Sequence, residues 1–174
     1  MRAAATAAVL GAALLHTGCA PALNWRDVRP PGSGLHAQLP CKPASQVRSV
    51  GLAGAKVSMT VLACDAGGAT WSLAWADVAE PAQVGPALAA LREAALNNVG
   101  AGAATPLPLA VKGSTQHAQA SRVAFAGKLP SGTAVQAQTA VFAKALRVFQ
   151  ASALGAALDA AAAQVYFDAL SLAP

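Results

Sequence analysis

The chain has 174 residues, of which 55% are hydrophobic and 11% are charged, with a formal net charge of +5. This length is typical of one domain, and the high hydrophobic content argues against intrinsic disorder, which needs low hydrophobicity and high charge. After the first twenty residues no window of about 18 residues stays apolar and uncharged, which argues against a multispanning membrane protein.

The chain opens with the features of an export signal. Met1-Arg2 is a positive start, Ala3–Leu15 is an uncharged apolar stretch, and small residues follow it. The stretch is too short for a membrane-spanning helix, which needs about 20 residues. We therefore predict a signal peptide over residues 1–18.

Thr17-Gly18-Cys19 resembles a bacterial lipobox, although His16 stands where that pattern prefers Leu, Val or Ile. The resemblance implies that the Cys19 thiol is acylated, with palmitate-type chains as the membrane anchor, and that the chain is cleaved before it. Ala20 stands where an inner-membrane retention signal has Asp, which implies an outer-membrane lipoprotein that faces the periplasm. The alternative is a plain secreted protein in which Cys19 has no role.

Two further cysteines remain if Cys19 carries lipid. In an oxidising compartment an even number of cysteines indicates a disulfide, so we expect a bridge between Cys41 and Cys64. Neither residue has the spacing of a metal ligand. Two buried free thiols are the alternative.

The mature chain divides into a tether and a domain. Residues 19–34 are rich in Pro and Gly and predict a lipidated N-terminus and tether, which Trp25 and Val28 dock onto the domain. Residues 35–174 predict a single domain, which begins with a short strand over residues 35–39.

A β-hairpin is the clearest pattern within the domain, and it follows a short strand over residues 46–52. Apolar residues alternate with small or polar ones in two runs. These apolar residues are Val57, Met59 and Val61 in the first run and Trp71, Leu73 and Trp75 in the second. Pairing Val61 with Trp71 places all six on one face and leaves a three-residue turn that ends with Gly67 in the left-handed region.

Two helices and a set of strands complete the prediction. Pro81 suits the first turn of a helix whose regular part is expected to begin close to Pro86; it carries one apolar stripe and ends at Gly100. The stripe consists of Val84, Leu88, Leu91, Ala95 and Val99. Residues 101–110 predict a loop or irregular edge strand, and a second helix is expected over residues 156–169. Between them lie three strands, over residues 116–126, 134–143 and 146–153. This order of strands, helix, strands and helix predicts an α+β fold in which two helices pack an antiparallel sheet.

The C-terminal helix is expected to turn one apolar face to the sheet. That face consists of Leu158, Ala161, Ala162, Val165, Tyr166 and Ala169.

Several segments together resemble a group of uncharacterised lipoproteins of Gram-negative, betaproteobacterial species. They are Asn24–Pro30, Leu39–Pro43, Ala69–Ala74 and Tyr166–Leu170. The order of elements is also similar to small PsbP-like domains. These resemblances imply a binding or assembly-assisting domain, and they bring no catalytic residues to transfer.

Residues suited to catalysis are few in the mature chain. His36 and His117 are its only histidines, and each is expected to be exposed or half-buried and not catalytic. There is no Gly-x-Ser-x-Gly elbow, phosphate-binding glycine loop or Cys-x-x-Cys metal pattern. Trp71 and Trp75 could form a ligand platform, but core packing is the expected role.

The sequence thus predicts a non-enzymatic envelope protein without a cofactor. It would be held to the membrane through Cys19 and would bind an envelope partner and no nucleic acid. One alternative is an envelope hydrolase that uses His117 or His36 as a base, and the other is a purely structural lipoprotein.

Overall fold

The computed structural model describes residues 22–173, so the predicted signal peptide and Cys19 lie outside the described residues. It contains a seven-stranded sheet in the order β3-β4-β5-β9-β8-β7-β6 and a three-stranded sheet in the order β1-β2-β10. All strand pairs in both sheets are antiparallel, which confirms the predicted α+β class.

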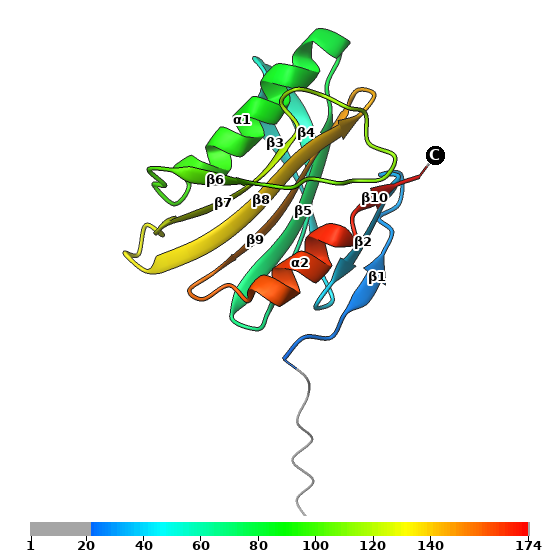
Figure 1. Cartoon of the computed structure of the whole chain (residues 1–174). Coiled ribbons are helices and arrows are strands. Elements are labelled where there is room, and N and C mark those ends of the chain that lie inside the picture. The colour runs from blue at the N-terminus through cyan, green and yellow to red at the C-terminus, as the bar shows by residue number, and fades with distance from the viewer. Residues whose placement is uncertain (1–21, 174) are drawn as a thin grey trace, which may run out of the picture.

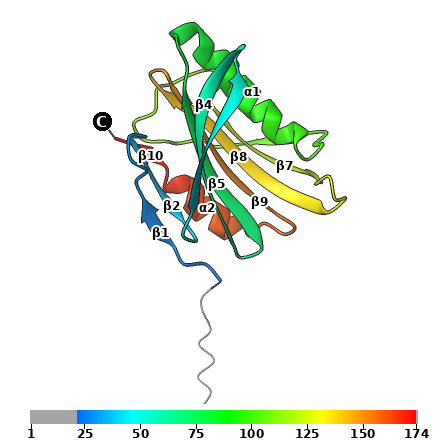
Figure 2. The same cartoon turned by 180° about the vertical axis from the view of Figure 1, so that it is seen from behind.

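The strands are β1 (Arg26–Val28), β2 (Leu35–Leu39), β3 (Ala44–Leu52), β4 (Ala55–Ala66), β5 (Ala69–Asp77), β6 (Ala104–Leu107), β7 (Ser121–Lys128), β8 (Ala134–Lys144), β9 (Arg147–Gly155) and β10 (Ser171–Leu172). The helices are α1 (Val84–Asn97), which a short 3-10 turn over Pro81–Gln83 precedes, and α2 (Ala160–Asp168). In Figures 1 and 2 the small sheet and α2 lie together at one side of the central sheet, and α1 lies apart from them.

The central sheet is buried on both faces. On one face, Trp71 and Leu73 pack with β2 and with Tyr166 of α2. On the other, the side chains of α1 pack over Met59 and Val141. Because both faces contact another layer, both alternating residue sets of the central strands are apolar.

The observed hairpin register differs from the predicted one. Cys64 pairs with Trp71 and Leu62 with Leu73, so the turn between β4 and β5 contains only Gly67 and Gly68. Both glycines have positive φ, 60° and 73°, as a tight two-residue hairpin turn requires.

This three-residue shift changes which side chains share a face. Val57, Met59 and Val61 lie on the α1 side, whereas Trp71 and Leu73 lie on the α2 side. The prediction of one common apolar face was wrong because it assumed that only one face of the hairpin is covered.

Helix α1 follows the prediction closely. Its buried residues include Val84, Leu88 and Leu91, and Val99 is buried just beyond its end, before Gly100 with φ 57°.

Helix α2 is shorter than predicted, and the set of its residues that faces the sheet is shifted by about one position along the sequence. Asp159 caps its first turn by accepting hydrogen bonds from the backbone of Ala161 and Ala162. The buried face contains Tyr166 and Phe167, whereas Val165, predicted to face the sheet, is 45% exposed.

A buried arginine fastens α2 to the sheet. Arg122 of β7 lies under the ring of Phe167, with 4.1 Å from its guanidinium carbon to the ring centre. Its Nη2 donates to Gln138 at 2.7 Å and to Gln164 of α2 at 3.4 Å. Burial lowers the pKa of the Arg122 guanidinium, and the charge of Asp168 opposes that shift.

The segment predicted as a tether also contributes a strand. β1 lies within residues 19–34 and pairs with β2, and Trp25 contacts Trp71 edge-on with 6.0 Å between ring centres. The docking predicted for Trp25 and Val28 therefore includes backbone pairing.

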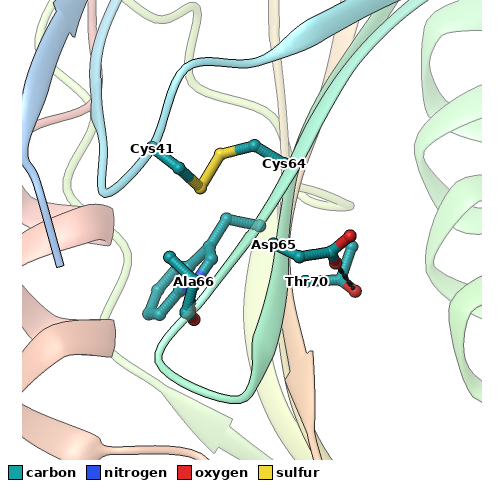
Figure 3. Close-up of a disulfide and its surroundings, with 6 residues drawn as sticks. Cys41, Cys64, Asp65, Ala66 and Thr70 are labelled. Carbon is teal, nitrogen blue, oxygen red and sulfur yellow. Dashed lines mark hydrogen bonds between the residues drawn. A yellow bond between two sulfur atoms is a disulfide. The ribbon is translucent and has the colours of Figure 1, made fainter. Parts of the chain in front are cut away.

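The predicted disulfide is present. Cys41, just after β2, bonds to Cys64 of β4 with 5.9 Å between their Cα atoms. Figure 3 shows the bond between Cys41, in the loop after β2, and Cys64 of β4, while Asp65 points away from it and contacts Thr70. The bridge therefore joins the small sheet to the central sheet.

Replacing both cysteines with serine is expected to lower the free energy of unfolding by about 3 kcal/mol. The reason is that a loop of this length would no longer be closed in the unfolded chain. Urea unfolding followed by tryptophan fluorescence measures the change, and reducing agent should lower the stability of the wild type alone. A difference below about 1 kcal/mol would show that packing alone holds the two sheets together.

Candidate functional site

A groove runs along the small sheet where the end of β1, the start of β2, the loop at residues 112–113 and β10 meet. Its volume is about 660 Å³, within the size range of ligand sites. Three of its lining residues, Arg29, His36 and Lys112, are basic, and none is acidic. The full lining consists of Arg29, Pro30, Gly34, Leu35, His36, Lys112, Gly113, Ser171, Leu172 and Ala173.

The floor of the groove is apolar and its rim is charged. Leu35 and Leu172 are 2% and 5% exposed, so their side chains lie in the core beneath the groove. Arg29 and Lys112 are exposed. An apolar floor with a few converging cations suits a ligand that joins an anionic group to an apolar body.

Backbone contacts hold the wall at residues 112–113 against β10. The N–H of Leu172 donates to the carbonyl of Lys112 at 2.7 Å. A Cβ at Gly113 would lie 2.3 Å from the carbonyl oxygen of Leu172, and its φ is +81°. Only glycine allows this close approach.

The loop between β1 and β2 is fixed from both sides. Ser33 Oγ donates to the carbonyl of Pro30 at 2.7 Å and accepts from the N–H of Leu35 at 2.9 Å. Arg147 donates to the carbonyl of Gly32 and makes two hydrogen bonds to the carboxylate of Asp77, at 2.6 and 2.7 Å. The Arg147 guanidinium lowers the pKa of Asp77.

His36 lies in this groove, on the outer face of β2. Its Nε2 is 3.3 Å from Asp27 Oδ1, and Ser171 lies directly opposite it on β10. An acid, an imidazole and a hydroxyl thus occupy three adjacent strands. A nucleophile and its base must lie within about 2.6–3.2 Å of each other. Within residues 22–173 no such hydrogen bond joins His36 to Ser171.

His117 lies elsewhere, in an apolar pocket of about 440 Å³ beside the start of α1. The pocket is also lined by Pro81, Val84, Thr115, Ala143, Ala145 and Leu146. The ring accepts a hydrogen bond at Nδ1 from the backbone of Gln119, at 3.0 Å. In the described part of the chain, this imidazole forms no hydrogen bond or ion pair with an acid or a serine.

The tryptophan pair does not form a ligand platform. Trp71 is 1% exposed, its Nε1 donates to the carbonyl of Ala66 at 3.0 Å, and its ring packs edge-on against Tyr166. Trp75 is partly buried against the same core. Core packing, the expected role, is what the structure shows.

Lys112 is a site residue that the sequence did not single out. Lys112 is far along the chain from β2, and it reaches the groove only because β10 pairs with β2 and bridges to Lys112. A two-residue strand near the end of the chain has no periodicity that could predict this pairing.

Comparison with protein-family models and with curated proteins found no match for this chain. Over residues 22–173, no helix is long and apolar enough to cross a membrane. The same residues contain no group of three or more His, Cys, Asp or Glu that could hold a metal ion.

Proposed function

We propose that this chain is a lipid-anchored protein of the cell envelope that faces the periplasm. It acts by binding and not by catalysis, as an accessory or assembly factor, and its binding site is the basic groove at β2 and β10. The observation that carries the proposal is the convergence of Arg29, His36 and Lys112 over an apolar floor.

The position of the groove relative to the start of the described chain supports this reading. Leu23 packs at the β4–β5 turn, where its side chain lies 2.8 Å from a Cβ placed on Gly67. The groove is lined by Arg29 and Pro30, at the opposite end of β1, and by Ala173. Figure 1 marks the C-terminus next to this end of β10. An anchor at Cys19 would therefore place the groove on the side of the domain away from its own membrane.

The charge of the groove defines the ligand class. His36 already has Asp27 as a partner, whereas Arg29 and Lys112 are exposed cations that form no salt bridge within residues 22–173. Two exposed cations that are not paired with an acid attract anions and strengthen hydrogen bonds to them. A phosphate or carboxylate head would meet these cations, and an apolar tail would lie along the mostly apolar lining of the groove.

A hydrolase that uses His36 is the second candidate. The contact of His36 with Asp27 and the position of Ser171 favour it. The exposure of the site speaks against it, since the side chains of His36 and Asp27 are 36% and 67% exposed and water screens their charges.

Binding of octyl phosphate tests the groove directly. The Arg29→Ala/Lys112→Ala double variant should bind it at least tenfold more weakly, because each charge-assisted hydrogen bond contributes about 1.5–3 kcal/mol. Octanol, which has the same apolar body without the charge, should bind at least tenfold more weakly to the wild type. Titration calorimetry or NMR shifts of the full chain provide the measurement.

Lys56→Ala is the matched control for this titration, because Lys56 is an exposed cation on β4 outside the groove. It should leave the affinity unchanged. Equal losses in the control and in the double variant would contradict a specific site. Release of alcohol from an octyl ester that disappears in Ser171→Ala would favour the hydrolase instead.

The membrane anchor has a separate test. The wild-type chain should incorporate labelled palmitate in cells and fractionate with outer membranes, and Cys19→Ser should do neither, because two or three acyl chains anchor a protein stably. Label retained by Cys19→Ser, or a wild-type chain that stays in the cytoplasmic fraction, would overturn the anchor without affecting the result for the groove.

A further inference from the structure

The two edges of the central sheet are protected very differently. β6 forms one edge, and it has only four residues, one of which is Pro106. β3 forms the other, with nine residues, no proline and one charge, Arg48. Short strands, prolines and charges are the usual means of preventing an edge from pairing with another chain.

The free edge of β3 presents unpaired backbone groups to solvent. β3 pairs with β4 without a bulge, from Ala44 to Leu52, and Leu52 with Ala55 closes a two-residue turn. Residues that close such a turn exchange both hydrogen bonds, and bonded positions alternate along the ladder. Ser45, Val47 and Ser49 therefore direct their N–H and C=O groups away from β4.

The side chains of β3 have a symmetric order around Val47, which is 66% exposed. The residues next to Val47 on both sides are polar, those two positions away are serines, and those three positions away are apolar. The segment is Ala44-Ser45-Gln46-Val47-Arg48-Ser49-Val50. In an antiparallel pair of identical strands residue i meets residue j and j meets i, so this order brings side chains of the same kind together.

We infer that two copies of this chain associate through β3, antiparallel and centred on Val47. In this register Val47 meets Val47 of the second copy, Ser45 meets Ser49, and Gln46 meets Arg48. The last contact has a precedent within the chain, because Arg48 donates to Gln46 Oε1 at 2.7 and 3.2 Å. The two arginines do not face each other, so the pairing places no like charges in contact.

The pairing extends the central sheet across both copies. A single added strand buries a small area, so the dimer is expected to form in a concentration-dependent way. Membrane anchoring would favour it by raising the local concentration, but the inference does not depend on the anchor or on the groove.

Cysteine cross-linking of the full chain tests the register. Val47→Cys should give a disulfide-linked dimer on mild oxidation, because paired residues have Cα atoms about 5.5 Å apart, within disulfide reach. Ser49→Cys alone should not, because its symmetry mate is four residues away along the strand, about 13 Å. A mixture of Ser45→Cys and Ser49→Cys chains should give the mixed dimer.

Val47→Lys should shift the wild-type dimer to monomer in light scattering, because it places two charges face to face. Val165→Lys changes another exposed valine, on α2, and should leave the dimer intact. Thermal melting shows whether each variant is folded. Failure of Val47→Cys to cross-link would overturn the inference, and this is also the result expected if β3 pairs with a different protein. Equal cross-linking by Ser49→Cys alone would overturn the proposed register and with it the inference.

Discussion

The structure depends on the alternation of side chains along β2. Leu35, Ala37 and Leu39 point inward and are at most 2% exposed, so they cover the face of the central sheet that carries Trp71. The residues between them, His36 and Gln38, point outward, and His36 lines the groove. One five-residue strand thus builds part of the core and part of the site.

Contacts from both ends of the chain keep β2 in place. β1 pairs along one side of it and β10 along the other, and the Cys41–Cys64 bridge ties its end to β4. Tyr166 adds a link between layers, because its hydroxyl donates to the carbonyl of Ser72 at 2.6 Å. Burial raises the pKa of that hydroxyl, so it stays a donor at physiological pH.

Local patterns in the sequence predicted the features that depend on neighbouring residues. The stripe of Val84, Leu88 and Leu91 predicted α1, and the cysteine count predicted the disulfide, because both signals need little knowledge of the fold. The hairpin register failed for a physical reason. A strand covered on both faces has apolar residues on both, so alternation no longer selects one register.

The groove could not be predicted in the same way. Its charges come from the end of β1, from β2 and from a loop before β7, and Lys112 of that loop meets the other two only through the pairing of β10 with β2. His36 was considered as a site residue, but its positions beside Asp27 and opposite Ser171 were not predicted. The burial of Arg122 could not be predicted either, because its contact with Phe167 joins residues that are distant in the sequence.

Native-state hydrogen exchange of the β2 amides tests the central claim most directly. If β2 is an integral layer, the bonded amides of residues 35–39 should exchange only through global unfolding, as slowly as those of β5 and β9. Shortening the chain by removing residues 171–174 should raise the exchange rate of β2 before that of β5. Fast exchange of β2 in the intact chain would contradict the account, because the small sheet would then be a loosely attached flap and not part of the core.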